Sequence, residues 1–131
     1  MRKWLRRIAL CFAAGSAGSL INTVVIWAGA RFPASAGVAA HLARAQYPTG
    51  FYVRIVWGGL AAMLFLLPLL PSRWLVRGLF WGILAAALQL VVVPLLVYHG
   101  MRLALAPQLS ALALSCLWGV ATAGLLRLLG D

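Results

Sequence analysis

Four long apolar runs constrain this chain more than any other feature of its sequence. They cover residues 8–30, 51–70, 79–98 and 103–129. Each run reaches the roughly 20 residues that an α-helix needs to cross about 30 Å of hydrocarbon. Backbone groups in lipid must bond within the chain, which selects helices, and strict β-barrel alternation is missing. The pattern predicts a single all-α domain, residues 1–131, with four transmembrane helices in a bundle.

The composition agrees with a membrane as the solvent. Hydrophobic residues make up 65% of the 131 residues, and charged residues make up 9%. A soluble domain carries about 25% charged residues, and a chain this short has too little interior to hide so much apolar surface. The surplus apolar surface is therefore predicted to face lipid or another protein.

The basic residues predict the orientation of the helices. The chain has 11 Lys and Arg residues and one acid, Asp131. Seven of them fall on the predicted inner side: Arg2, Lys3, Arg6, Arg7, Arg73, Arg77 and Arg127. Because Lys and Arg concentrate on the cytoplasmic side, both termini are predicted to be cytoplasmic. The first run continues past any signal-peptide cleavage point, so it is interpreted as an uncleaved span.

The segment between the first two runs, residues 31–50, is long for a loop in a compact domain. Within it, "AGVAAHLARAQ" places Val38, Leu42 and Ala45 on one face of a helix. This spacing predicts a short interfacial helix on the outer membrane surface.

Small residues recur at helical spacing in all four runs, with Gly119 and Ala123 in the fourth, and they let helix backbones approach closely. The positions singled out for helix packing are Gly15, Gly18, Ser19, Gly58, Gly59, Gly78 and Gly82. Two interpretations remain open, which are packing within the chain and packing between subunits.

Two neutral amides, Asn22 and Gln89, lie near the middle of the first and third runs. An unpaired amide in hydrocarbon costs several kcal/mol, so each is predicted to find an interhelical partner. A bond between the two, direct or through water, is expected if their helices touch. The alternative is a polar lining for a small solute.

The outer arginines predict contact with anionic lipid or with a partner protein. This set comprises Arg54, Arg31, Arg44 and Arg102, together with Trp57. Arg54 lies about one turn inside the outer end of the second run, where it can extend to the headgroups or bind a phosphate or carboxylate. The basic residues flank apolar runs and form no continuous face, so nucleic acid is not a predicted partner.

No arrangement of residues indicates catalysis or a cofactor. The only Asp is terminal, so no Ser-His-Asp set exists, and zinc spacings, phosphate-binding loops and dinucleotide fingerprints do not occur. His41 and His99 are predicted to be solvated or interfacial on the outer side. Cys11 and Cys116 are predicted to be buried free thiols. The chain is predicted not to be an enzyme, with no catalytic residue, metal or cofactor.

The run from Tyr52 to Leu95 contains "YVRIVWGG" and "LFLLPLL", followed by an Arg-Gly pair and a third span with glutamine. This order resembles an uncharacterised family of small four-helix bacterial inner-membrane proteins. The resemblance implies a multi-pass protein of the bacterial inner membrane. It implies no activity, and it directs attention to Arg54, Trp57, Gly58, Gly59 and Gln89.

The sequence therefore predicts a non-enzymatic accessory, assembly or structural subunit of a membrane complex, whose partner is another membrane protein or a second copy. Two alternatives remain. One is a small oligomeric channel or transporter for an anion or neutral solute, which Asn22, Gln89 and the outer arginines favour. The other is a lipid-binding or lipid-handling protein, shaped by Arg54 and a kink at Pro94.

Overall fold

A computed structural model describes residues 2–29, 31–32, 49–67, 73–96 and 105–129. Every regular element among these residues is a helix, which confirms the all-α prediction for this part of the chain. The elements are α1 (Arg2–Gly29), α3 (Thr49–Ala61), the 3-10 helix η1 (Ala62–Leu66), α4 (Trp74–Leu96) and α5 (Leu105–Leu128). The interfacial helix predicted between the first two spans falls outside the described residues.

Three helical stretches are long and apolar enough to cross a membrane, and they indicate a membrane protein. They are Arg2–Gly29, Trp74–Val91 and Gln108–Leu128. A fourth stretch, Gly50–Leu66, is apolar but shorter. α1 begins at Arg2, ahead of the predicted 8–30 span, and α4 begins at Trp74, ahead of the predicted 79–98 span. Arginines flanking both apolar runs are therefore helical, since arginine has a good helix propensity.

The helix formed by α3 and η1 ends for a local reason. Leu67 follows η1 and adopts an extended conformation, with φ −74° and ψ 126°. Leu67 precedes Pro68, and a residue before proline is disfavoured in the α region. The helix therefore stops short of the predicted end at residue 70.

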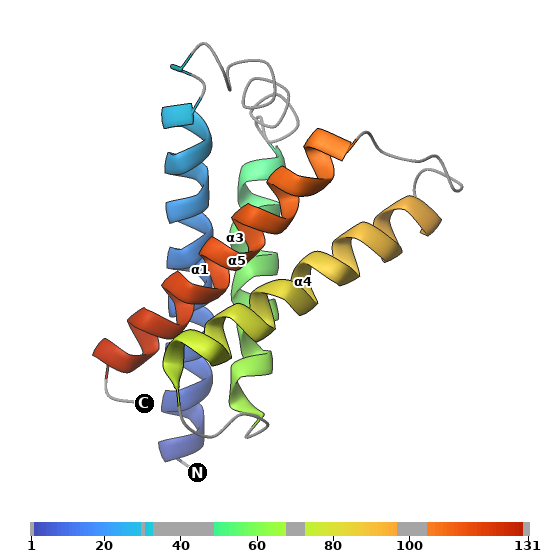
Figure 1. Cartoon of the computed structure of the whole chain (residues 1–131). Helices are drawn as coiled ribbons and strands as arrows, with labels where there is room; N and C mark the ends of the chain where they lie inside the picture. Colours follow the sequence, from blue (N-terminus) through green and yellow to red (C-terminus); the bar gives the residue numbers. More distant parts are fainter. Residues whose placement is uncertain (1, 30, 33–48, 68–72, 97–104, 130–131) are drawn as a thin grey trace.

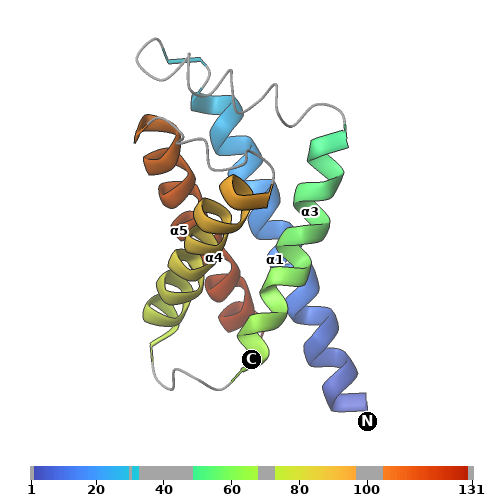
Figure 2. The ribbon, with the colours of Figure 1, turned by 90° about the vertical axis from the view of Figure 1, so that its right-hand side faces the viewer.

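The helices form two antiparallel pairs (Figures 1 and 2). One pair is α1 with α3 and η1, and the other is α4 with α5. The pairs join mainly where α1 packs against α5. Both termini lie at the same end of the bundle (Figure 1). That end is called the terminal end below.

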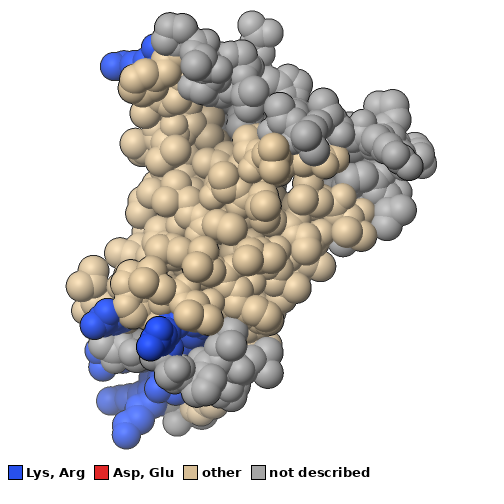
Figure 3. Space-filling model, viewed as in Figure 1, with Lys and Arg blue, Asp and Glu red and all other residues tan. Residues whose placement is uncertain are grey.

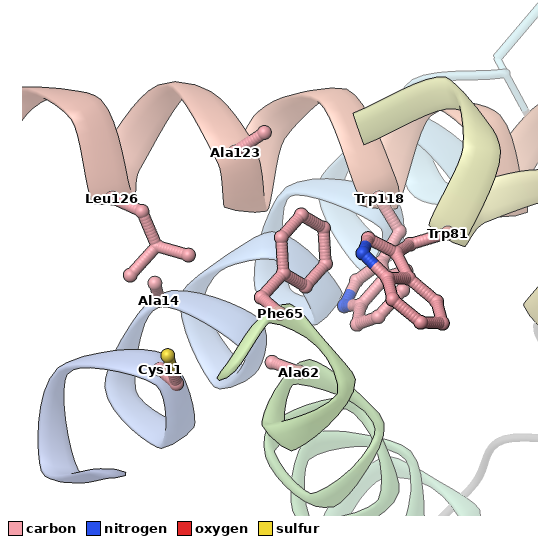
Figure 4. Packing of buried hydrophobic residues seen from close by; sticks show 8 residues of the cluster. All are labelled: Cys11, Ala14, Ala62, Phe65, Trp81, Trp118, Ala123 and Leu126. Atoms are coloured by element: carbon pink, nitrogen blue, oxygen red, sulfur yellow. The ribbon is translucent and has the colours of Figure 1, made fainter. Parts of the chain in front are cut away.

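The core cluster joins all four helical segments (Figure 4). Its residues are Cys11, Ala14, Ala62, Phe65, Trp81, Trp118, Ala123 and Leu126. The Phe65 ring lies at the centre, 6.2 Å from the ring of Trp81 and 6.2 Å from that of Trp118, measured between centroids. The Trp118 contact is edge-to-face, which is a favourable arrangement for aromatic rings.

Candidate functional site

A line of small polar residues runs between α1 and its neighbours, and we call it the polar seam. It comprises Ser16, Ser19, Asn22 and Thr23 of α1 with Ser115 and Thr122 of α5. All are buried except Ser16, which is half-buried. The α1 members recur every three or four residues, so one face of the helix carries them toward α3 and α5. This seam contains most of the buried polar groups of the described residues, which makes it the first candidate site.

The seam links α1 to both of its neighbours through backbone carbonyls. The Asn22 Nδ2 group donates to the Leu114 carbonyl of α5 at 2.8 Å. In the reverse direction, Trp118 Nε1 of α5 donates to the Gly15 carbonyl of α1 at 3.0 Å. Toward α3, the Ser16 hydroxyl donates to the Ile55 carbonyl at 3.3 Å. These bonds join α1 to each neighbour, and hydrogen bonds between helices add to the packing that drives helix association in lipid.

The structure does not form the predicted bond between Asn22 and Gln89. Asn22 is buried and directed at α5, whereas Gln89 is exposed on α4. The reason is the packing order, since α1 contacts α3, η1 and α5, while α4 packs chiefly against α5. Asn22 therefore has its interhelical contact within the chain, and Gln89 faces outward.

Two oxygen atoms of the seam accept no hydrogen bond in the described part of the structure. They are Asn22 Oδ1 and Thr122 Oγ1. The Thr122 hydroxyl lies against Gly18, so close that a Cβ on that glycine would be 2.6 Å from it. The seam is thus packed against backbone, as expected for a structural contact between helices.

We expect Asn22→Leu to lower the free energy of unfolding by no more than about 1 kcal/mol, because one interhelical hydrogen bond is lost while the unpaired Oδ1 is removed as well. Asn22→Ala should cost more, because it also leaves a cavity. The measurement is unfolding of the purified protein in mixed micelles, followed by tryptophan fluorescence. If both variants lost the same large amount of unfolding free energy, the stability of the protein would depend on the Asn22 amide itself.

The small-residue faces are occupied within the chain. Gly15 and Gly58 are in contact across the α1–α3 interface, and a Cβ on Gly58 would overlap the Ser19 hydroxyl. On α4, a Cβ on Gly82 would lie 2.6 Å from the Ser115 carbonyl oxygen of α5. A Cβ on Gly59 would lie 2.6 Å from the Phe12 ring. The sequence left open packing within the chain and packing between subunits. In the structure these glycine faces pack within one chain.

Gly78 shows the same use of a small residue at the α4–α5 crossing. A Cβ there would lie 2.8 Å from the Gly119 carbonyl oxygen and 2.9 Å from the Val120 Cα. Gly119, on the opposing face, is the small residue that the sequence pairs with Ala123 in the fourth run. Its signal was a spacing of four residues to Ala123, which is common in membrane helices.

Sequence reasoning gave Arg77 only a role in orientation, and the structure adds a second one. The Arg77 Nη2 group donates to the Phe65 carbonyl, and its guanidinium lies over the Phe65 ring, 5.6 Å from the centroid. Arg127 lies over the Trp74 ring in the same way, also at 5.6 Å. Carbonyls at a helix end have no partner in the helix, and Arg77 supplies one to η1. These arginines hold the terminal end of the bundle together.

The predicted outer contact residues are described only in part. Arg54 is half-buried on α3, and Arg31 and Trp57 are exposed. Arg44, Arg102, His41 and His99 lie outside the described residues. The described chain contains no group of three or more His, Cys, Asp or Glu residues that could hold a metal ion.

The chain matches no protein-family model, and it has no significant similarity to a curated protein or to a solved structure. The resemblance across residues 52–95 therefore stays a prediction. The function is inferred below from the geometry of the chain itself.

Proposed function

We propose that the protein is a non-enzymatic, multi-pass accessory subunit of the bacterial inner membrane, which binds a partner membrane protein or a second copy through α4. The single observation that carries this proposal is the exposure of the Gln89 amide on α4.

Four spans are supported by the length of the second helical segment. α3 has 13 residues and η1 has 5. At about 1.5 Å per residue for α and about 2.0 Å for 3-10, the two add up to roughly 30 Å, which is the thickness of the hydrocarbon core. The change to 3-10 geometry thus lengthens a segment that would otherwise be too short.

The charge distribution supports cytoplasmic termini. Figure 3 shows Lys and Arg gathered at the terminal end, one small basic patch at the opposite end, and a band without Lys, Arg, Asp or Glu among the described residues between them on the face in view. A band without charges fits the hydrocarbon region, and the more basic end fits the cytoplasmic side.

The partner contact is supported by the surroundings of Gln89. α4 also exposes large apolar side chains, among them Ile83, Leu88 and Val91. Gln89 is also two turns beyond Gly82, on the face that Gly82 packs against α5. Gln89 is exposed all the same, so α5 does not cover its side chain. The ends of α4 and α5 that lie away from the terminal end are apart (Figures 1 and 2).

Energetics favour a partner for this amide. Gln89 lies 15 residues along α4 from Trp74, which is about 22 Å at 1.5 Å per residue. That depth is within the hydrocarbon of a spanning helix, where an unpaired amide costs several kcal/mol. A partner helix that hydrogen-bonds the amide removes this cost.

The test is photo-crosslinking in intact membranes. A photoreactive residue at position 89 should give an adduct, whereas one at Val24, exposed on α1, should not. The mass of the adduct distinguishes a second copy from a different protein. Gln89→Leu should weaken the complex about threefold to thirtyfold, since an interhelical amide contact is worth about 0.6–2 kcal/mol.

Two results would contradict the proposal. One is recovery from gentle detergent only as a monomer, without an adduct at position 89. The other is passage of a small anion or neutral solute through liposomes that Gln89→Leu abolishes, which would assign the amide to transport.

A further inference from the structure

The first two turns of α1 stand clear of the bundle. All residues from Arg2 to Ala9 are exposed, and burial begins at Leu10 and Cys11. α1 has 28 residues, which is about 42 Å at 1.5 Å per residue. The helix is therefore roughly 12 Å longer than a hydrocarbon core of about 30 Å. Its first turns extend to the headgroup layer of a bilayer.

These exposed turns have two chemically different faces. The basic residues are Arg2, Lys3, Arg6 and Arg7, and the large apolar residues are Trp4, Leu5 and Ile8. At about 100° per residue, the basic set covers an arc of about 140° and the apolar set covers about 100° on the opposite side. The segment is therefore amphipathic, and Lys and Arg on its polar face can attract anionic headgroups.

The two faces also have a defined direction relative to the bundle. Trp4 and Ile8 continue the line of Cys11, Gly15 and Gly18, which face the other helices. Arg2, Lys3 and Arg6 therefore point away from the bundle, whereas Arg7, one turn before Cys11, lies at the edge of the line that faces it.

Further positive charge lies at the same end. Arg73 and Arg77 are at the start of α4, and Arg127 is in the last turn of α5. The rings of Phe65 and Trp74 hold the guanidinium groups of Arg77 and Arg127 in place. The described residues contain no Asp or Glu, because the one acid of the chain is Asp131. With 11 basic residues and one acid in the chain, most of this positive charge has no counter-charge within the chain.

We propose that this end of the protein binds the phosphate groups of anionic phospholipids. We call the surface the basic end, and it consists of Arg2, Lys3, Arg6, Arg7, Arg73, Arg77 and Arg127. Charge complementarity selects an anion. The adjoining Trp4, Leu5 and Ile8 select a lipid over an acidic protein, because a tryptophan beside aliphatic side chains suits the boundary between headgroups and acyl chains. The inference goes beyond the proposed function and does not need the partner at Gln89.

The test measures lipid retention on the full chain. The purified protein in mixed micelles of phosphatidylglycerol and phosphatidylcholine is examined by native mass spectrometry. Wild type should retain the anionic lipid preferentially. Arg2→Gln with Arg6→Gln should reduce that preference about 25-fold, because each basic residue near an anionic surface is worth roughly fivefold in binding. The double variant Arg2→Lys with Arg6→Lys keeps the charge, so it should retain most of the preference for the anionic lipid.

Two further arms keep the result interpretable. Micelles expose both ends of the protein, so a change in membrane insertion does not affect the assay. The wild-type preference should also fall steeply as salt rises from about 0.05 to 0.5 M, because the Debye length shortens from roughly 14 Å to 4 Å.

Three outcomes would overturn the proposal. The first is equal retention of the two lipids by wild type. The second is an anionic preference that the glutamine variant keeps. The third is complete displacement of the lipid by millimolar inorganic phosphate or by an acidic polypeptide, which would assign the surface to a free anion or to a protein.

Discussion

Replacing Gly119 with alanine is expected to lower the free energy of unfolding by about 3 kcal/mol. A Cβ on Gly119 would lie 2.9 Å from the backbone nitrogen and Cα of Gly82 and still closer to the Gly78 carbonyl oxygen. Overpacking typically costs about 1–3 kcal/mol, and the upper end applies here because backbone atoms cannot turn aside as a side chain does. α4 must move away from α5, which also weakens the packing of Trp81.

Gly124→Ala is the matched control, five residues further along the same helix. The nearest atom to its new Cβ would be Cζ3 of Trp74 at 3.4 Å, which is an ordinary contact. Alanine has the better helix propensity, so Gly124→Ala should be neutral or slightly stabilising. Both variants are measured by unfolding in mixed micelles, followed by circular dichroism. Equal stability of the two would mean that α4 and α5 do not meet at Gly119.

Replacing Trp118 with alanine is expected to lower the free energy of unfolding by about 3–4 kcal/mol. Trp118 is buried on α5, where its ring meets the Phe65 ring edge-to-face and its indole nitrogen bonds the Gly15 carbonyl of α1. Truncation leaves a cavity among three helical segments, and Trp→Ala substitutions in cores cost about 3–5 kcal/mol. In lipid the loss is one of packing contacts, since lipid tails already provide an apolar medium.

Trp118→Phe separates the two contributions. Phenylalanine keeps an aromatic ring beside Phe65 but loses the donor to Gly15, so the expected cost is about 1 kcal/mol for the hydrogen bond plus a small packing loss. Chemical denaturation in micelles gives both free energies. If the phenylalanine variant were as unstable as the alanine variant, the hydrogen bond would dominate, and the view of the core as an aromatic cluster would be wrong.

The helices could be predicted because lipid leaves a chain few choices. Each apolar run must satisfy its own backbone, and only a helix of sufficient length does so within one segment. Helix ends were harder to predict. α1 and α4 extend into basic stretches that hydropathy assigns to loops, because arginine is a good helix former even where it ends an apolar run.

The candidate site could be predicted only in part. The sequence marked Gly15, Gly18 and Ser19 for helix packing and Asn22 for an interhelical contact, and the structure packs these residues of α1 against α3 and α5. The partner of Asn22 could not be predicted, because it is the Leu114 backbone carbonyl and every residue carries such a group. The contact of Arg77 with η1 was missed for the same reason.

Sequence by itself determined that the chain forms helices suited to a membrane, where its positive charges gather, and which helix faces are small enough for close approach. These are properties of a single segment, set by hydropathy, charge and 3.6-residue periodicity. Only the tertiary structure decided which helices are neighbours. This arrangement of neighbours turns Asn22 toward α5 and leaves Gln89 exposed. Helix pairing in lipid depends on the mutual fit of two surfaces, so no single segment specifies its partner.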